Sequence, residues 1–189
     1  VVGFVAILVT LTTLAAGYSL ADSYRKVDEV RVRVGNLSTR IIPMVNLLAN
    51  IAAHALQQEI HLERVFRYYE VRPLNSAAIR EETALFVKLG ELVDEEIQAA
   101  EVMVQNALKE RESLQVSEAI KFGELGPTLR NIEKEHQELH DHSLRVLELL
   151  AAEGPAAARA EEARLEAEAD HLDEELERML LSLEEFNVQ

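Results

Sequence analysis

The sequence predicts an all-α protein: an antiparallel four-helix bundle of long helices, preceded by an N-terminal transmembrane helix. Ala, Leu and Glu are abundant, whereas the 189 residues include only 7 Gly, 4 Pro and no Trp, a composition that favours helix over strand. The first 21 residues contain no charged side chain. In the remaining sequence, apolar residues recur at steps of three and four, the spacing of one helix face.

The first element is the uncharged segment Val1–Ala21, which is mostly aliphatic. A helix of that length rises about 30 Å, the thickness of the hydrocarbon core of a bilayer. We therefore predict a membrane helix over 1–21. Two other interpretations stay open: a signal peptide with a small-residue cleavage site at Ser19-Leu20-Ala21, and a buried helix of a soluble protein.

Residues 22–189 are predicted to form one ligand-binding domain, which helix breakers divide into four stretches. The first ends before Pro73, and Pro43 within it predicts a kink. Asn75 is a suitable N-cap for the second stretch. The four stretches span about 22–72, 77–114, 117–153 and 155–189.

The later breakers lie in and after the third stretch. Gly123-Glu124-Leu125-Gly126-Pro127 predicts an interruption that separates its first turns from the rest. Gly154 suits the residue that follows a helix C-terminus, and Pro155 suits the first turn of the next helix.

Each stretch carries one apolar seam with nearly heptad spacing, which predicts that all four helices pack around a common core. The fourth seam comprises Leu165, Ala169, Leu172, Leu176, Met179, Leu183 and Phe186. The third comprises Leu129, Ile132, His136, Leu139, Ser143, Val146 and Leu150. The second comprises Phe86, Leu89, Val93, Glu96, Ala100, Met103 and Ala107. The first is wider: Ile41, Met44, Val45, Leu48, Ile51, Ala52, Ala55, Leu62, Val65, Phe66 and Tyr69.

Polar residues interrupt three of these seams: Glu59 (beside Gln58), Glu96 and His136. A buried carboxylate is costly unless it is paired, hydrated or bound to a ligand. Counting residues outward from the turns places four side chains at a similar depth, the predicted histidine layer of His54, Glu96, His136 and His171. This layer has three interpretations: a polar layer that only sets helix register, a pocket for a small ligand or metal, or an error in the predicted helix register that leaves these residues solvated.

The spacing of His and Glu also fits metal binding. Glu133-Lys-Glu-His136 and Glu168-Ala-Asp-His171 are both Glu-x-x-His, the motif that ferritin-like di-iron bundles combine with two further Glu residues. His136 and His140 share one helix face. Imidazole and carboxylate ligands suit zinc, copper, nickel or iron. The candidate metal ligands are His54, Glu59, Glu96, Glu133, His136, His140 and His171.

Composition excludes several other functions. The net charge is −15, with 34 acidic and 19 basic residues, and nucleic-acid binding needs a basic surface instead. The chain has no Cys, so it has no disulfide, thiolate metal site or cysteine nucleophile. It also has no glycine-rich phosphate loop and no nucleophile elbow. We therefore expect a protein that is not an enzyme.

An apolar anchor joined to a long helical bundle resembles the extracytoplasmic sensor domain of bacterial transmembrane receptors such as methyl-accepting chemotaxis proteins. The resemblance is architectural and covers the whole chain; the segments HLERVFRYYE (His61–Glu70) and IEKEHQELHDH (Ile132–His142) look similar to segments of such receptors. It implies a homodimeric sensory domain in the bacterial inner membrane that binds a small ligand or metal in the periplasm. It also implies that the turns at Pro73 and Gly154 lie at opposite ends, one near the membrane and one far from it.

One feature departs from this pattern. Basic residues closely follow the apolar segment, and such residues normally mark the cytoplasmic side of a membrane: Arg25, Lys26, Arg31 and Arg33. Two alternative functions also stay open: a ferritin-like metal-binding bundle, and a purely structural anchored bundle.

Overall fold

The computed structural model describes residues 25–27, 31, 35, 37–71, 73–110, 114 and 116–188, without the side chains of Leu37 and 185–188. By its contacts the chain divides into two units, Val1–Thr39 and Arg40–Gln189. In the first unit, the Thr39 hydroxyl donates to the Gly35 carbonyl at 2.8 Å. The second unit contains the long helices.

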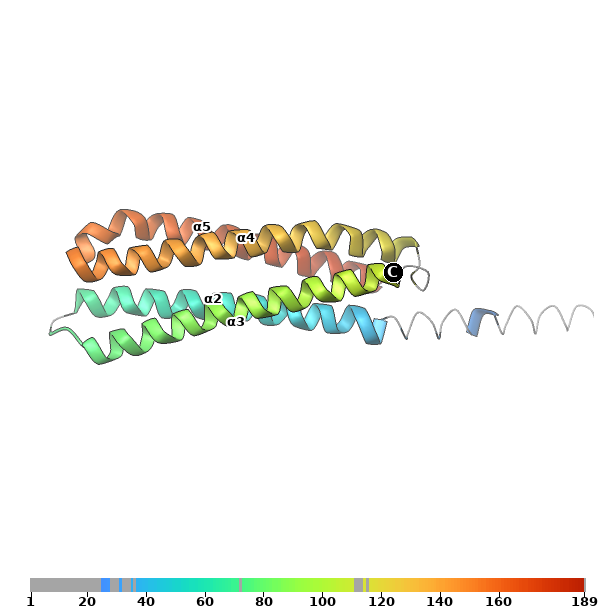
Figure 1. The fold of residues 1–189 in the computed structure, drawn as a ribbon, viewed down its shortest axis with the longest axis horizontal. Coiled ribbons are helices and arrows are strands. Elements are labelled where there is room, and N and C mark those ends of the chain that lie inside the picture. The colour runs from blue at the N-terminus through green and yellow to red at the C-terminus, as the bar shows by residue number, and fades with distance from the viewer. Residues whose placement is uncertain are drawn as a thin grey trace, which may run out of the picture. The chain divides into compact units, whose positions relative to one another are not determined.

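The described residues form one π-helical turn, η1 (Leu37–Ile41), and four long α-helices (Figure 1). The helices are α2 (Ile42–Glu70), α3 (Ser76–Lys109), α4 (Val116–Glu153) and α5 (Pro155–Val188). Consecutive helices pack side by side, and α5 returns to pack against α2. No strand occurs in the described ranges. The predicted all-α class with long helices is therefore confirmed.

The turn between α2 and α3 and the turn between α4 and α5 lie at the same end of the bundle, at the left of Figure 1. The connection from α3 to α4 lies at the other end, together with the end of α5. The expectation that the Pro73 and Gly154 turns occupy opposite ends was therefore wrong. Because each turn reverses the chain, the first and third turns of an up-down-up-down bundle must fall at the same end.

The predicted membrane helix over 1–21 lies outside the described residues. Among the helices that are described, none is both long enough and apolar enough to cross a membrane.

Pro43 lies in the first turn of α2, directly after η1. The kink predicted there within a helix over 22–72 stays a prediction, because most of 22–36 lies outside the described residues. A proline is tolerated in a first turn because the backbone N–H that it lacks would have no partner within the helix. The wide turn of η1 therefore precedes Pro43, and α2 runs on from it to Glu70.

The helix α3 begins where the capping signal predicts. The Asn75 side chain accepts a hydrogen bond from the Ala78 backbone N–H at 3.2 Å, which satisfies one of the free donors of the first turn. The helix ends at Lys109, earlier than the predicted 114, with a last bond from Glu110 N–H to the Asn106 carbonyl.

The predicted interruption of the third stretch was wrong, because α4 continues through Pro127. A proline inside a helix costs about 3 kcal/mol. Core residues lie on both sides of it, with Phe122 and Leu125 before Pro127 and Leu129 and Ile132 after it, and all four are buried. Continuing the helix keeps both groups in the core, which offsets the cost of the proline.

Gly154 separates α4 from α5 as predicted. Its φ is +86°, a value that side-chain-bearing residues rarely adopt. Its N–H donates to the Leu150 carbonyl at 3.0 Å, and its own carbonyl accepts from Ala157 N–H at 3.2 Å. The tight reversal brings α4 and α5 together along their length.

The core confirms the seam of α5 as far as Leu183, and most of the seam of α4. Most positions of the other two predicted seams are buried as well, and a few positions differ by one residue. In α3 the buried positions are Ile97 and Gly90 rather than Glu96 and Leu89, and in α2 Gln58 is buried rather than Glu59.

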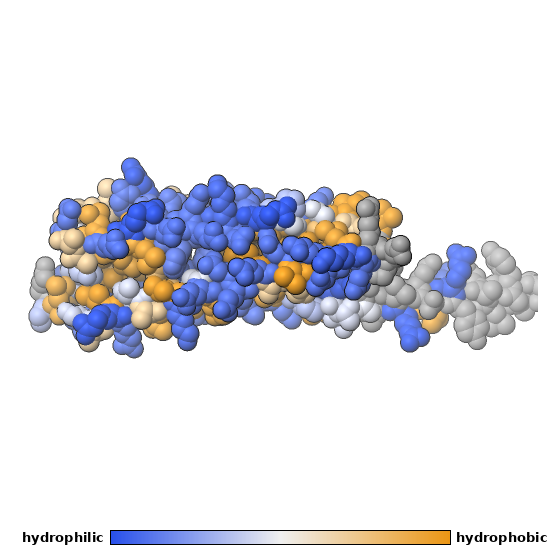
Figure 2. All heavy atoms as spheres, in the orientation of Figure 1, coloured by the Kyte–Doolittle hydropathy of each residue, from blue (hydrophilic) through white to orange (hydrophobic). Residues whose placement is uncertain are grey.

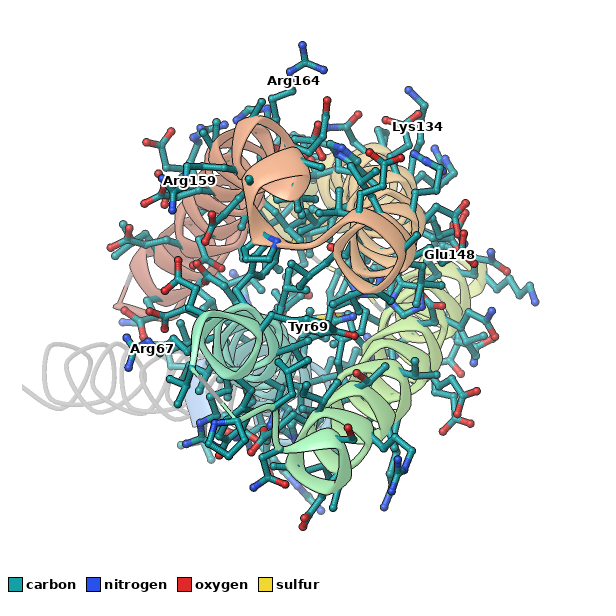
Figure 3. All side chains as sticks on the ribbon, turned by 90° about the vertical axis from the view of Figure 1, so that its left-hand side faces the viewer. Arg67, Tyr69, Lys134, Glu148, Arg159 and Arg164 are labelled. Atoms are coloured by element: carbon teal, nitrogen blue, oxygen red, sulfur yellow. The ribbon has the colours of Figure 1, made fainter. Side chains whose placement is uncertain are left out.

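The outer surface of the bundle carries many charged residues but also exposed hydrophobic ones such as Leu56, Val102 and Ile120. Figure 2 shows hydrophilic side chains over much of the face in view, with hydrophobic residues between them. In the end-on view of Figure 3, Tyr69 points toward the middle of the four helices, where it packs against the core, whereas Lys134 and Arg164 point outward.

Candidate ligand site between two helices

A cavity of about 370 Å³ lies along the junction of α2 and α5, and is named here the α2–α5 cavity. Its volume falls in the range of small-molecule sites. Figure 3 shows Arg67 of α2 and Arg159 of α5 on the side of the bundle where these two helices are neighbours. The apolar part of the lining consists of Ala55, Leu62, Phe66, Phe86, Leu139, Leu165, Ala169 and Leu172.

Two buried polar side chains lie among this apolar lining, Gln58 of α2 and Ser143 of α4. Ser143 is only 1 % exposed, and its hydroxyl has no hydrogen-bond partner among the described residues. A buried hydroxyl without a partner costs about 1–3 kcal/mol. Ser143 therefore offers a hydrogen bond to a molecule that enters the cavity.

Five carboxylates complete the lining: Glu59, Glu63, Glu162, Glu166 and Asp173. None of the described residues that line the cavity is Lys, Arg or His. Arg67 pairs with one of the five, Glu63, at 2.5 Å. No ion pair reaches Glu59 or Asp173 in the described part of the chain, so the wall carries a local excess of negative charge.

The packing of these carboxylates changes their proton affinity. Burial raises the pKa of Glu59 above its ordinary value, and the nearby charge of Asp173 raises this pKa further. The pKa of Asp173 is raised by burial and by Asp170. Burial and Glu70 likewise raise the pKa of Glu162, although Arg159 opposes this shift. Each shift means that a negative charge is disfavoured at its position.

Gln58 connects the cavity to a cluster of polar groups behind it, the polar layer of Gln58, Asp94, His136 and His140. The Gln58 amide donates from Nε2 to His140 Nδ1 at 2.8 Å, and its Oε1 lies 3.1 Å from His136 Nε2. The other ring nitrogen of His136, Nδ1, lies 2.9 Å from Asp94 Oδ1. The Gln58 amide thus joins α2 to α4, and the contact of His136 with Asp94 joins α4 to α3.

The polar layer is closely packed. His136 is 1 % exposed, and burial lowers its pKa, although Asp94 acts in the opposite direction. The His140 ring stacks on Phe86 with the ring planes 2° apart and the centroids separated by 5.2 Å. Gly90 leaves the space that His140 and Gln58 occupy.

The structure brings together only some of the predicted site residues. His54 Nδ1 is hydrogen-bonded to Glu96 Oε2 at 2.8 Å, as one half of the predicted histidine layer. His136 instead contacts Asp94, and His171 lies on the outside, 3.6 Å from Glu135. The predicted histidine layer therefore does not form as one cluster. In α3 the buried residue is Ile97 rather than Glu96. Glu96 therefore contacts His54, and Asp94 is the α3 carboxylate that contacts His136.

His136 and His140 lie together as predicted, with ring centroids 6.2 Å apart and Gln58 in contact with both. The other predicted ligands are dispersed: Glu59 lies on the α2–α5 cavity and Glu133 is half-buried on α4. Glu168 contacts His142 at 2.9 Å, and the other ring nitrogen of His142 is 3.2 Å from Glu161.

In the described ranges, no three His, Cys, Asp or Glu side chains are close enough to hold a metal ion. The two Glu-x-x-His motifs therefore do not converge on a di-iron site as the ferritin-like alternative requires.

Several residues of the candidate site were missed by sequence reasoning. Ser143 was placed on the seam of its helix, but a single serine in an apolar seam gave no reason to expect a ligand. Glu162, Glu166 and Asp173 looked like an ordinary solvated face, because α5 is rich in Glu throughout. The sequence did contain one signal. Several carboxylates lie close together between Glu166 and Asp173, and that segment contains no Lys or Arg and only one His, His171.

Comparisons of the chain with protein families, with curated proteins and with solved structures give no match.

Proposed function

We propose that this chain is the sensory domain of a membrane receptor and that it binds a small molecule in the α2–α5 cavity. The observation that carries the proposal is a cavity of ligand size that contains a buried, unpartnered hydroxyl. Stability alone gives no reason to keep such a hydroxyl, or carboxylates whose charge is disfavoured, whereas a binding site does.

The position of the cavity supports a role in signalling. It lies between the first and last long helices among the described residues, α2 and α5. A ligand held between them would alter their separation or rotation, and shifts of about 1–2 Å between packed helices are a common form of signal. The helix α2 follows the uncharged segment 1–21 in sequence, so its displacement would be passed toward that segment.

The cellular setting is part of the same proposal. The uncharged segment 1–21 would anchor the chain in a bacterial inner membrane, with the bundle in the periplasm, and two copies would associate as a homodimer. The length and apolar character of 1–21 support the anchor. A reporter enzyme that is active only in the periplasm can be fused after Gln189. Its activity tests on which side of the membrane the bundle lies.

The ligand-binding proposal is tested by filling the cavity. Ala55 lines the cavity, whereas Ala53 is an exposed alanine on the same helix. Small molecules that raise the melting temperature of the wild-type chain are to be titrated into Ala55→Phe and Ala53→Phe. We expect binding to be lost in the first variant and kept in the second. A screen without any hit, or equal binding by both variants, would contradict the proposal.

A purely structural bundle is the second candidate, and the polar layer favours it. Gln58 and His136 use their polar atoms on one another and on Asp94 and His140, as a layer that sets helix register does. In that case His136→Leu would lower stability, because it leaves the buried Gln58 Oε1 without a donor, but would leave signalling unchanged. A sensory domain loses its response when the residues around Gln58 are rearranged.

A further inference from the structure

We propose that the ligand of the α2–α5 cavity is an organic cation, an ammonium or guanidinium group carried on a small apolar body. This inference rests on the proposed function and specifies the chemistry of its ligand. Three features of the same cavity support it: uncompensated carboxylates, an apolar interior, and the unpartnered hydroxyl of Ser143.

The negative charge of the cavity wall favours a cationic ligand. Glu59 of α2 and Asp173 of α5 both line the cavity, and the charge of Asp173 acts on Glu59. The other charged groups that act on Glu59 are also carboxylates: Asp170, Glu63 and Glu166. A cation placed among them would relieve their mutual repulsion, whereas an anion would add to it.

The interior selects an organic group. Leu62, Phe66, Leu165 and Leu172 present hydrocarbon to the cavity, and burying apolar ligand surface there contributes roughly 25 cal/mol per Å². A bare metal ion would gain nothing from this lining. The described carboxylates also form no group of three that is close enough to hold one.

Ser143 supplies the observation that is independent of charge. Its hydroxyl is buried on α4, behind the carboxylates of α2 and α5, and has no partner within the described chain. A hydroxyl can accept a hydrogen bond from an ammonium or guanidinium N–H. Acidic surface residues alone would not require this buried acceptor.

Three probes of matched size and different charge test the inference. Benzylamine is a cation near neutral pH, benzyl alcohol is neutral and benzoate is an anion. Each is titrated by calorimetry into the 1–189 chain in an uncharged maltoside detergent. We expect benzylamine to bind about tenfold more tightly than benzyl alcohol, and benzoate not to bind.

Variants locate the binding. The double variant Glu59→Gln/Asp173→Asn should bind benzylamine no more tightly than benzyl alcohol. Ser143→Ala should weaken benzylamine binding about threefold to tenfold. The matched control is Glu177→Gln, an exposed carboxylate of α5 outside the cavity lining, which should leave binding unchanged. Circular dichroism checks that each variant is folded, and the wild-type comparison of the three probes does not depend on any variant.

The outcomes separate this inference from the proposed function. Tighter binding of benzyl alcohol or benzoate would overturn the cation and leave a ligand-binding cavity. Equal loss of benzylamine binding in Glu177→Gln and in the double variant would show attraction to overall negative charge and would also overturn it. If none of the three probes binds, but other molecules bind the wild-type chain and not Ala55→Phe, the inference of a cationic ligand is wrong and the proposed ligand-binding function stands. If no molecule binds at all, both fail.

Discussion

Gly90 of α3 lies so close to His140 of α4 that a Cβ at residue 90 would be 2.5 Å from His140 Nδ1. The same Cβ would be 2.7 Å from Nε2 of Gln58. Neither neighbour is free to move, because His140 stacks on Phe86 and is hydrogen-bonded to Gln58. The glycine is therefore a requirement of the polar layer.

Replacing this glycine should destabilise the protein. Gly→Ala inside a helix normally stabilises by about 1 kcal/mol, but overpacking costs about 1–3 kcal/mol. We expect Gly90→Ala to lower the free energy of unfolding by about 1–2 kcal/mol in urea titration. Gly123→Ala is the control, because nothing lies within 4 Å of its Cβ position, and it should stabilise. Stabilisation by both substitutions would show that the polar layer is not tightly packed.

The close approach at Gly90 also explains one error in the predicted α3 seam. Heptad counting gave Phe86, Val93, Ala100 and Ala107 correctly, but it favoured Leu89 over a glycine, which gives no sequence signal of burial. The structure instead buries Gly90, since the side chains of two other helices fill the space beside it. Sequence periodicity predicts which helix faces are apolar, but it does not predict where a side chain of a neighbouring helix requires a glycine beside it.

The helices without such polar contacts were predicted better. The seam of α5, from Leu165 to Leu183, is buried as expected, because spacing alone defines a face when every position on it is aliphatic. The cavity could not be predicted in the same way. It depends on how far apart α2 and α5 lie at Glu59 and Asp173, and that separation is set by the packing of all four helices.

The buried imidazole should make stability depend on pH. Burial holds the pKa of His136 below its ordinary 6.5, so below this value the unfolded chain binds a proton that the folded chain resists. Stability should therefore fall as the pH drops from about 7.5 to 5.5. Urea unfolding of wild type and His136→Gln over this range checks the prediction. If wild type and His136→Gln show the same pH dependence of stability, that dependence comes from other titrating groups.

The cavity carboxylates should act in the opposite direction. The pKa values of Glu59 and Asp173 are raised above their ordinary 4.5 and 3.8, so the folded chain holds these protons more tightly than the unfolded chain. Their contribution favours folding at acid pH and is lost as the pH rises through the raised pKa values. Glu59→Gln/Asp173→Asn should therefore stabilise the protein at neutral pH and have little effect below the ordinary pKa values. Destabilisation at neutral pH would mean that these charges are paired.

The cap of α3 gives a test that is independent of the site. The Asn75 side chain accepts a bond from the Ala78 N–H, and removing an N-cap typically costs about 1 kcal/mol. We expect Asn75→Ala to lower the free energy of unfolding by that amount. Ser76→Ala, one residue further into the helix, is the matched control and should change stability by less than about 0.5 kcal/mol.

The central claim is that a ligand held in the α2–α5 cavity moves these two helices relative to each other. Because the chain has no cysteine, spin labels can be placed at the exposed pairs Gln57→Cys/Ala167→Cys on α2 and α5, and Gln98→Cys/Gln137→Cys on α3 and α4. Pulsed electron paramagnetic resonance then measures both distances with and without benzylamine. We expect the α2–α5 distance to change by about 1–2 Å and the α3–α4 distance to stay constant. A bound ligand that leaves the α2–α5 distance unchanged would contradict the claim.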